Sequence, residues 1–174
     1  MDNKKIKLLI AVLLLITAAA VGVTVWALFF REQQTVVLTP DYAPQEEEIN
    51  IEAIPGDSGE KMESEEGGGS VSLSYSNEAT IDISDKKAYV YFANPGKSNQ
   101  DMVLQIVISE EVILQSGTIV PGYKVSELDL LKDAEKMLSP GGYDGKFVVL
   151  YYSPESGEKA IVNTEIPIHI TVRE

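Results

Sequence analysis

The sequence predicts an all-β domain, a sandwich of about seven short strands, preceded by one transmembrane α-helix and a disordered linker. Three observations support this fold class. An uncharged apolar run lies near the N-terminus, and an acidic stretch containing several glycines follows it. From Val71 to Glu174, apolar and polar residues alternate in short runs, which turn-forming residues separate.

The apolar run extends from Leu8 to Phe30 without a charged residue. At about 1.5 Å of rise per residue, a helix of this length spans the roughly 30 Å hydrocarbon core of a bilayer. Three lysines precede the run within residues 1–7, whereas only Arg31 follows it closely, and basic residues favour the cytoplasmic side. We therefore predict a cytoplasmic tail (1–7), a single transmembrane helix (8–30) in contact with the cell-membrane bilayer, and an extracytoplasmic C-terminal domain.

A cleaved signal peptide is the alternative for the same segment. The stretch from Ile6 to Ile16 resembles the apolar region of a signal peptide, and Ala18-Ala19-Ala20 supplies small residues for cleavage. Residues 21–30 remain apolar, however, where a secreted protein usually becomes polar. The length of the run therefore favours the uncleaved anchor.

Residues 31–70 predict an acidic, disordered linker. They contain eleven acidic residues against Arg31 and Lys61, which gives a net charge of −9. Such a segment buries too little apolar surface to offset the entropy lost on ordering. We expect it to separate the outer domain from the membrane.

Residues 71–174 predict the strands of the outer domain. A continuously apolar run at 89–92 predicts a central strand, and a further strand is expected to begin near Lys124, with one helical turn near Asp133. Pro167 within the last strand predicts an edge or a bulge. Period-two alternation predicts strands with one buried face at 71–75, 81–83, 102–108, 147–151 and 166–172.

Four segments of the outer domain follow one another in an order that resembles a known group of domains. They are Ala93-Asn94-Pro95-Gly96, Ile119-Val120-Pro121-Gly122-Tyr123, the strand 125–130, and the stretch 138–149 with its Gly-Gly-Tyr turn. In this order the domain resembles small immunoglobulin-like domains of bacterial surface proteins. It is especially similar to short, uncharacterised proteins of Gram-positive bacteria that carry one N-terminal anchor and one extracytoplasmic immunoglobulin-like domain. The resemblance implies an immunoglobulin-like β-sandwich and no catalytic residues.

Few side chains of the sequence could catalyse a reaction or bind a metal ion. The sequence has no cysteine and one histidine, His169, which the alternation places on a polar face, so we predict no metal site, no cofactor and no catalytic residue. The aspartates lack the spacing of a calcium loop.

From Val71 onward, fifteen acidic and nine basic residues give a net charge of −6, which disfavours nucleic acid as a partner. Tyr123 and Tyr143 lie in predicted turns and are the candidate contact residues.

The sequence therefore predicts a single-pass, membrane-anchored surface protein whose outer domain is a non-catalytic accessory or interaction module of the bacterial cell envelope. Its partner is expected to be another envelope protein, and nothing in the sequence supports or excludes a homo-oligomer. Two alternatives remain open. One is an envelope carbohydrate-processing enzyme, which needs paired carboxylates, and the other is a binding or inhibitor protein secreted after signal cleavage.

Overall fold

The structure is a computed structural model that describes residues 10, 12–17, 21, 40–44, 46–57, 59–65 and 68–174. The chain divides into two compact units, Met1–Leu38 and Thr39–Glu174. In the first unit the described residues are helical, and the Thr17 hydroxyl donates a 2.9 Å hydrogen bond to the carbonyl oxygen of Leu13. The tail predicted for 1–7, and the rest of the helix predicted for 8–30, lie outside the described residues. Within the part of the chain that is described, no helix is both long enough and apolar enough to cross a bilayer.

The second unit is built from β-strands, which confirms the all-β prediction. Its described residues form one sheet of nine strands, in the order β1-β7-β4-β3-β9-β8-β5-β6, with β2 paired to β4. Apart from the parallel pair β3–β9, neighbouring strands are antiparallel. One short 3₁₀ helix, η1 (Ala134–Met137), follows β7. The strands are β1 (Ile51–Ala53), β2 (Ser74–Tyr75), β3 (Glu78–Asp82), β4 (Lys87–Asn94), β5 (Asp101–Ile108), β6 (Glu111–Gln115), β7 (Tyr123–Asp129), β8 (Gly141–Tyr152) and β9 (Lys159–Arg173).

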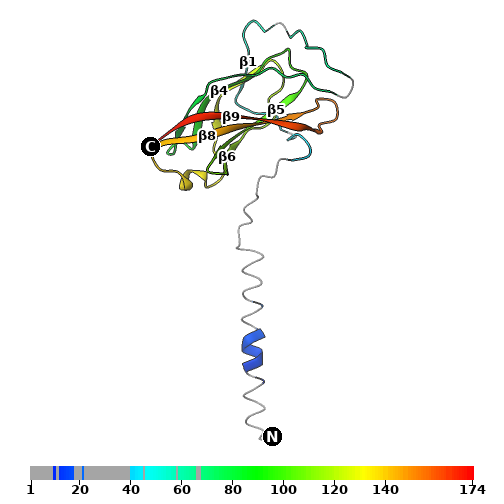
Figure 1. Cartoon of the computed structure of the whole chain (residues 1–174). Coiled ribbons are helices and arrows are strands. Elements are labelled where there is room, and N and C mark those ends of the chain that lie inside the picture. The colour runs from blue at the N-terminus through cyan, green and yellow to red at the C-terminus, as the bar shows by residue number, and fades with distance from the viewer. Residues whose placement is uncertain are drawn as a thin grey trace. The chain divides into compact units, whose positions relative to one another are not determined.

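The sheet curls so that its two halves face each other across the core. In Figure 1 the ribbons of β1 and β4 lie above those of β8 and β6. Although β3 and β9 separate β4 from β8 in the sheet, Phe92 of β4 packs edge-on against Phe147 of β8, with ring centroids 6.2 Å apart. The last strand contributes its alternate residues Ile166, Ile168 and Ile170 to the same core, as the sequence predicted.

The strands β5 and β8 are buried on both faces. The alternating pattern of 102–108 predicted one buried face, and Met102, Leu104 and Ile106 indeed lie in the main core. The opposite face carries a second apolar cluster, which Ala43 and Val112 cover. Its members are Val103, Val107, Val148, Leu150 and Tyr152.

A strap formed by residues 40–44 and 46–48 supplies part of this cover. The Tyr152 hydroxyl donates to the Pro40 carbonyl, and the Thr118 hydroxyl donates to the Pro44 carbonyl. The Gly117 amide donates to the Glu48 carboxylate at 2.8 Å. A Cβ at Gly117 would lie 2.8 Å from the Glu48 nitrogen and 2.9 Å from the Glu46 carbonyl oxygen, so the strap approaches as closely as it does because residue 117 is glycine.

Residues after the strap also pack on the domain. β1 extends the sheet by pairing with β7, from Ile51 opposite Val125 to Ala53 opposite Tyr123. The Asp57 carboxylate accepts hydrogen bonds from the Gly96 and Gly59 amides, and these two bonds are the main reason why the pKa of Asp57 lies below its ordinary value. The described part of the segment predicted as a free linker is therefore bonded to the domain, and the second compact unit begins at Thr39 rather than at Val71.

The strand and turn predicted around residues 124–133 are present. β7 begins at Tyr123, and η1 follows Asp133. The β5–β6 hairpin turns through Ser109 and Glu110, both with positive φ (51° and 69°), as a two-residue turn of this kind requires. This turn was not predicted, because neither residue is the asparagine or glycine that usually marks it.

Candidate functional site

The strand β9 has a partner along only part of its outer edge. β8 pairs with one side of β9 along most of its length. On the other side, residues 41–43 bond to 157–159 at the start of the strand, and β3 pairs with it from His169 to Arg173. Between these two contacts, residues 160–168 have no strand partner on that side among the residues that the structure describes. We call this open edge the β9 gap.

The direction of the backbone groups along the β9 gap follows from its two ends. The Lys159 amide donates to Asp41 and the His169 amide donates to Asn77, so odd-numbered residues direct their N–H groups to the open side. Pro167 lies on that side, where its missing N–H removes no hydrogen bond from the sheet. The prediction of an edge or a bulge is confirmed only locally, because β9 lies between β3 and β8 in the sheet and is open on one side only between its two contacts. The amides and carbonyls of Asn163 and Glu165 face the gap by the same alternation, counted back from His169, whereas the bulge at residues 160–162 interrupts the alternation.

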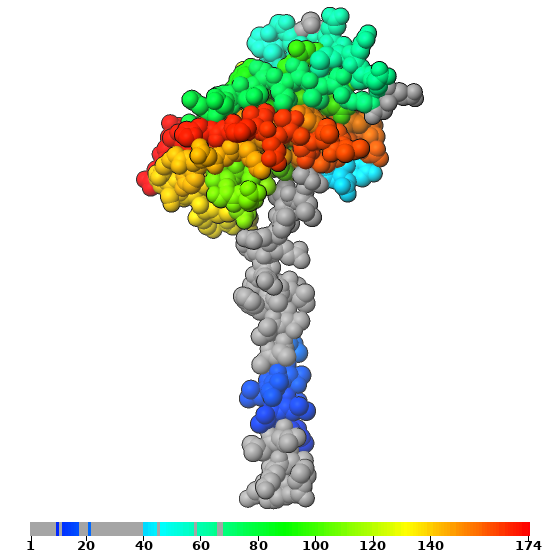
Figure 2. Space-filling view, in the orientation of Figure 1, coloured from blue at the N-terminus to red at the C-terminus, as the bar shows by residue number. Residues whose placement is uncertain are grey.

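Two apolar side chains are fully or largely exposed in the β9 gap. Ile161 has a relative exposure of 102% and Val162 of 67%. They lie within a β-bulge of β9, because Leu150 pairs with Asn163 whereas Tyr152 pairs with Lys159, which leaves residues 160–162 opposite Tyr151 alone. β9 forms the red to orange-red band across the face shown in Figure 2.

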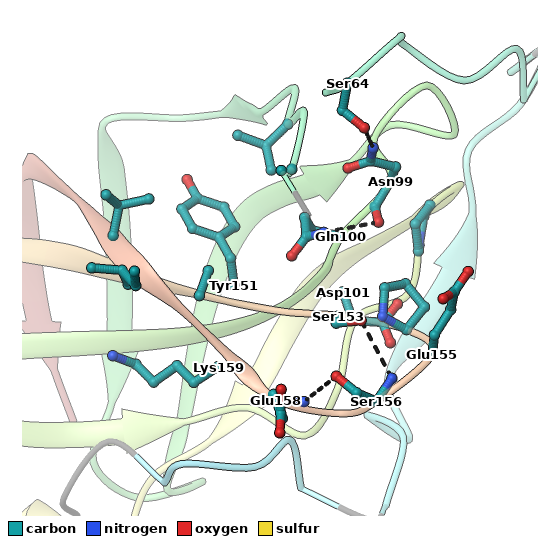
Figure 3. Close-up of a pocket in the computed structure, with 18 of the residues that line it drawn as sticks. Ser64, Asn99, Gln100, Asp101, Tyr151, Ser153, Glu155, Ser156, Glu158 and Lys159 are labelled. Carbon is teal, nitrogen blue, oxygen red and sulfur yellow. Dashed lines mark hydrogen bonds between the residues drawn. The ribbon is translucent and has the colours of Figure 1, made fainter. Parts of the chain in front are cut away.

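A groove of about 1350 Å³ adjoins the open edge. One wall comes from the β8–β9 hairpin and β9, including residues 153–156 and 158–164. The other comes from residues 61, 64, 65, 68, 69, 71 and 99–101. Figure 3 shows Ser64, Asn99 and Gln100 at the top and Glu155, Ser156, Glu158 and Lys159 at the bottom. The Asn99 side-chain amide donates to the Ser64 hydroxyl at 2.8 Å.

Acidic side chains outnumber basic side chains in the lining. Burial raises the pKa of Asp101, and the Lys61 ammonium partly opposes this shift. Burial also raises the pKa of Tyr151, whose hydroxyl lies 2.6 Å from that of Thr164. The acidic residues of the lining are Glu65, Asp101, Glu155 and Glu158, and the basic residues are Lys61 and Lys159.

The two predicted contact residues lie elsewhere. Tyr123 begins β7, where it pairs with Ala53 and Asn94. Tyr143 pairs with Ile170, and its hydroxyl both accepts a hydrogen bond from the Ser139 amide and donates one to the Ser139 carbonyl. Neither tyrosine lines the groove, and the structure does not bring them together. Tyr143 closes a turn.

The single histidine also lies outside the groove. His169 is exposed, as the alternation predicted, and its Nδ1 lies 2.9 Å from an oxygen of Asp144. The described residues contain no group of three His, Cys, Asp or Glu side chains arranged to hold a metal ion. The aspartates considered for calcium include Asp82, which faces Arg173, and Asp133, which bonds Lys136.

The β9 gap could not be located from the sequence. Its exposed residues, Ile161 and Val162, belong to an apolar stretch that resembles any other strand. Pro167 was the one local signal of an edge. The residues that border the gap at its two ends, 41–43 and 77, are more than eighty positions away in the chain.

Comparisons with known proteins assign no family. No family model matches the chain, and no curated protein matches it. A solved structure, that of AggA, the major subunit of aggregative adherence fimbriae type I from Escherichia coli, is 10% identical over 61% of this chain and 96% of that chain. Its TM-score is 0.29, and a likeness at this level supports no conclusion about the fold or the function.

Proposed function

We propose that this chain is a non-catalytic interaction module of the bacterial cell envelope, held at the membrane by residues 8–30, whose outer domain contacts another envelope protein. The observation that carries the proposal is the β9 gap. It combines unpaired strand backbone, two exposed apolar side chains and an adjoining groove in one place. Unpaired strand edges readily pair with another chain unless they are covered, and large apolar side chains exposed together mark contact surfaces.

We further propose that the domain is an immunoglobulin-like sandwich. The order β7-β4-β3 on one side of the core and β9-β8-β5-β6 on the other supports this assignment. In immunoglobulin folds two antiparallel sheets enclose the core, and one of them is extended by two additional strands in variable-type domains. The parallel pair β3–β9 joins the two halves.

The membrane anchor is supported by the uncharged run 8–30 and its basic N-terminal flank. The described helical residues of the first unit expose apolar side chains, including Leu13, Leu14 and Leu15. Intact mass spectrometry of the chain isolated from bacterial membranes tests the anchor. We expect the uncleaved chain in the membrane fraction, whereas a product that begins near Val21 would overturn this part of the proposal.

The shape and lining of the groove favour a polymeric partner over a small molecule. Small-molecule sites commonly enclose about 300–1,000 Å³ and are mostly apolar. This groove is larger, lies open beside a strand edge and is lined by many polar side chains. A protein segment fits such a groove because main-chain hydrogen bonds can run along the strand.

Site-specific photo-crosslinking in native membranes tests the interaction. A photoreactive residue at Val162 should crosslink to an envelope protein, whereas the same residue at Met137, which is also exposed but lies in η1, should not. Equal crosslinking from both positions, or none from Val162, would overturn the proposal.

A carbohydrate-processing enzyme is the second candidate. The raised pKa of Asp101 in the groove favours it, since a general acid needs such a shift. Replacing Asp101 with Asn decides between the two. The interaction module predicts that Val162 still crosslinks in the variant and that neither protein hydrolyses cell-wall polysaccharide. Hydrolysis by the wild-type chain that is lost in the variant would establish the enzyme.

A further inference from the structure

We infer that the partner enters the β9 gap as an extended strand that hydrogen-bonds to β9, and that this strand has alternating apolar residues flanked by basic ones. This inference rests on the proposed function, because it specifies how the partner of that same surface binds. It concerns the mode of binding and the chemistry of the partner.

The dimensions of the β9 gap suit a strand. Residues 160–168 span roughly 30 Å at about 3.3 Å per residue. Both ends of this stretch already carry strand-type neighbours, residues 41–43 antiparallel and β3 parallel to β9. An added strand would therefore complete the row of hydrogen bonds between two existing contacts.

The backbone groups of the β9 gap are available for pairing. Asn163 and Glu165 direct an N–H and a C=O to the open side, whereas Pro167 offers only its carbonyl. Main-chain hydrogen bonds of this kind provide affinity with little dependence on sequence, and side-chain contacts provide the specificity.

Side chains around the gap specify the partner's composition. Ala160, Val162 and Thr164 all line the groove, Ala160 and Thr164 half-buried and Val162 exposed, so the added strand needs apolar or β-branched residues at alternate positions. Four acidic and two basic side chains line the groove, and residues 71–174 carry a net charge of −6. Lysine or arginine residues flanking the apolar positions complement this charge.

A second copy of this chain fits less well. Each copy would bring the same excess of acidic side chains to the contact, and residues 71–174 of each copy carry a net charge of −6, so two copies repel each other. We therefore assign the gap to a different protein with a basic strand, and a second copy is an outcome of the test below.

A designed peptide and the full chain in detergent micelles test the mode of binding. The probe is Lys-Lys-Val-Thr-Val-Thr-Val-Lys-Lys, and its control is the same peptide with glutamates in place of the lysines. Amide hydrogen exchange, read by mass spectrometry with residue-resolving fragmentation, should show new protection at Asn163 and Glu165 with the basic peptide. No protection at these amides, or equal protection by the glutamate peptide, would overturn the inference.

A variant that removes one donor sharpens the test. Asn163→Pro deletes an N–H that faces the gap and bonds nothing described within the domain, and Asn163→Ala is the matched control. Loss of one hydrogen bond worth about 0.5–1.5 kcal/mol weakens peptide binding roughly two- to tenfold in the proline variant only. Equal binding by both variants, at unchanged urea midpoints, would refute strand addition.

The outcomes separate the inference from the proposed function. If the Val162 crosslink persists in Asn163→Pro with undiminished yield, strand addition fails while the interaction module stands. If the chain in micelles has twice the protein mass of a monomer, and its amides at 163 and 165 are protected but become exchangeable on dilution, a second copy occupies the gap. The inference of a basic partner strand is then overturned.

Discussion

The Tyr152 hydroxyl donates a 3.1 Å hydrogen bond to the carbonyl oxygen of Pro40, a residue that precedes it by 112 positions. Tyr152 is completely buried in the second apolar cluster, beneath the strap. Burial, together with the Asp41 carboxylate, raises the pKa of Tyr152 to about 12. The strap is thus held to the outer face of β8 by the Tyr152 hydroxyl, which titrates at high pH.

The Tyr152 contact predicts a dependence of stability on alkaline pH. Because the folded-state pKa lies above the ordinary value of 10, the stabilisation is fully present below pH 10 and is lost as the pH rises toward 12. Tyr152→Phe should lower the free energy of unfolding by about 1 kcal/mol at pH 7. This difference should shrink between pH 10 and 12, as measured by urea unfolding. Tyr91→Phe, at an exposed position, is the control and should leave the pH profile unchanged.

The packing of Phe92 against Phe147 predicts a coupled loss of stability. Phe92→Ala removes a fully buried ring that joins the two halves of the curled sheet, and should lower the free energy of unfolding by about 3–5 kcal/mol. A double-mutant cycle with Phe147→Ala should show a coupling of about 0.5–1.5 kcal/mol. Tyr91→Ala, at the adjacent exposed position, should cost far less, and an equal cost would contradict the assignment of Phe92 to the core.

The hairpin turn at Ser109 and Glu110 predicts a stabilising substitution. Glu110 has φ 69°, a conformation that costs a residue with a Cβ roughly 1–2 kcal/mol. Glu110→Gly should therefore raise the midpoint of thermal unfolding. Glu111→Gly is the matched control in the adjacent strand, where glycine is unfavourable, and should lower it. A lower midpoint for Glu110→Gly would show that the turn has another conformation.

The close approach at Gly117 predicts selective loosening of the strap. Gly117→Ala places a Cβ against the backbone of Glu46 and Glu48, so the strap must shift outward. Limited proteolysis should then cleave the chain within residues 40–48 faster than in the wild type. Gly142→Ala has no atom within 4 Å of its added Cβ and serves as the control. Equal cleavage of both variants would mean that the strap does not depend on residue 117.

The domain boundary predicts the behaviour of shortened chains. A chain of residues 71–174 lacks the strap and β1, so it exposes the second apolar cluster and the edge of β7. It should unfold at a lower urea concentration than residues 39–174 and should bind more of a dye that reports exposed apolar surface. Equal stability of the two chains would restore Val71 as the boundary.

The composition of residues 31–70 led to the prediction of a free linker, and the reason is instructive. High negative charge and few apolar residues normally leave a chain unable to order itself. Here the favourable free energy that orders the described part of this segment comes from its contacts with the rest of the domain. The Thr118 backbone, the Gly96 amide and the apolar cluster around Tyr152 supply partners that lie far away in the sequence. A local measure of composition contains no information about such partners.

Periodicity by itself determined that much of the chain beyond Val71 forms strands, that Ile166, Ile168 and Ile170 face the core, and that His169 faces away from it. Alternation is a local property of an extended chain, so it can be read without knowing the fold. The strand predicted at 71–75 with one buried face was wrong, because only Ser74–Tyr75 is a strand and both of its residues are exposed.

The β9 gap was decided only by the tertiary structure. Whether the edge at Asn163 and Glu165 is covered depends on where residues 41–43 and β3 end. Those positions result from long-range packing rather than from any neighbouring residue.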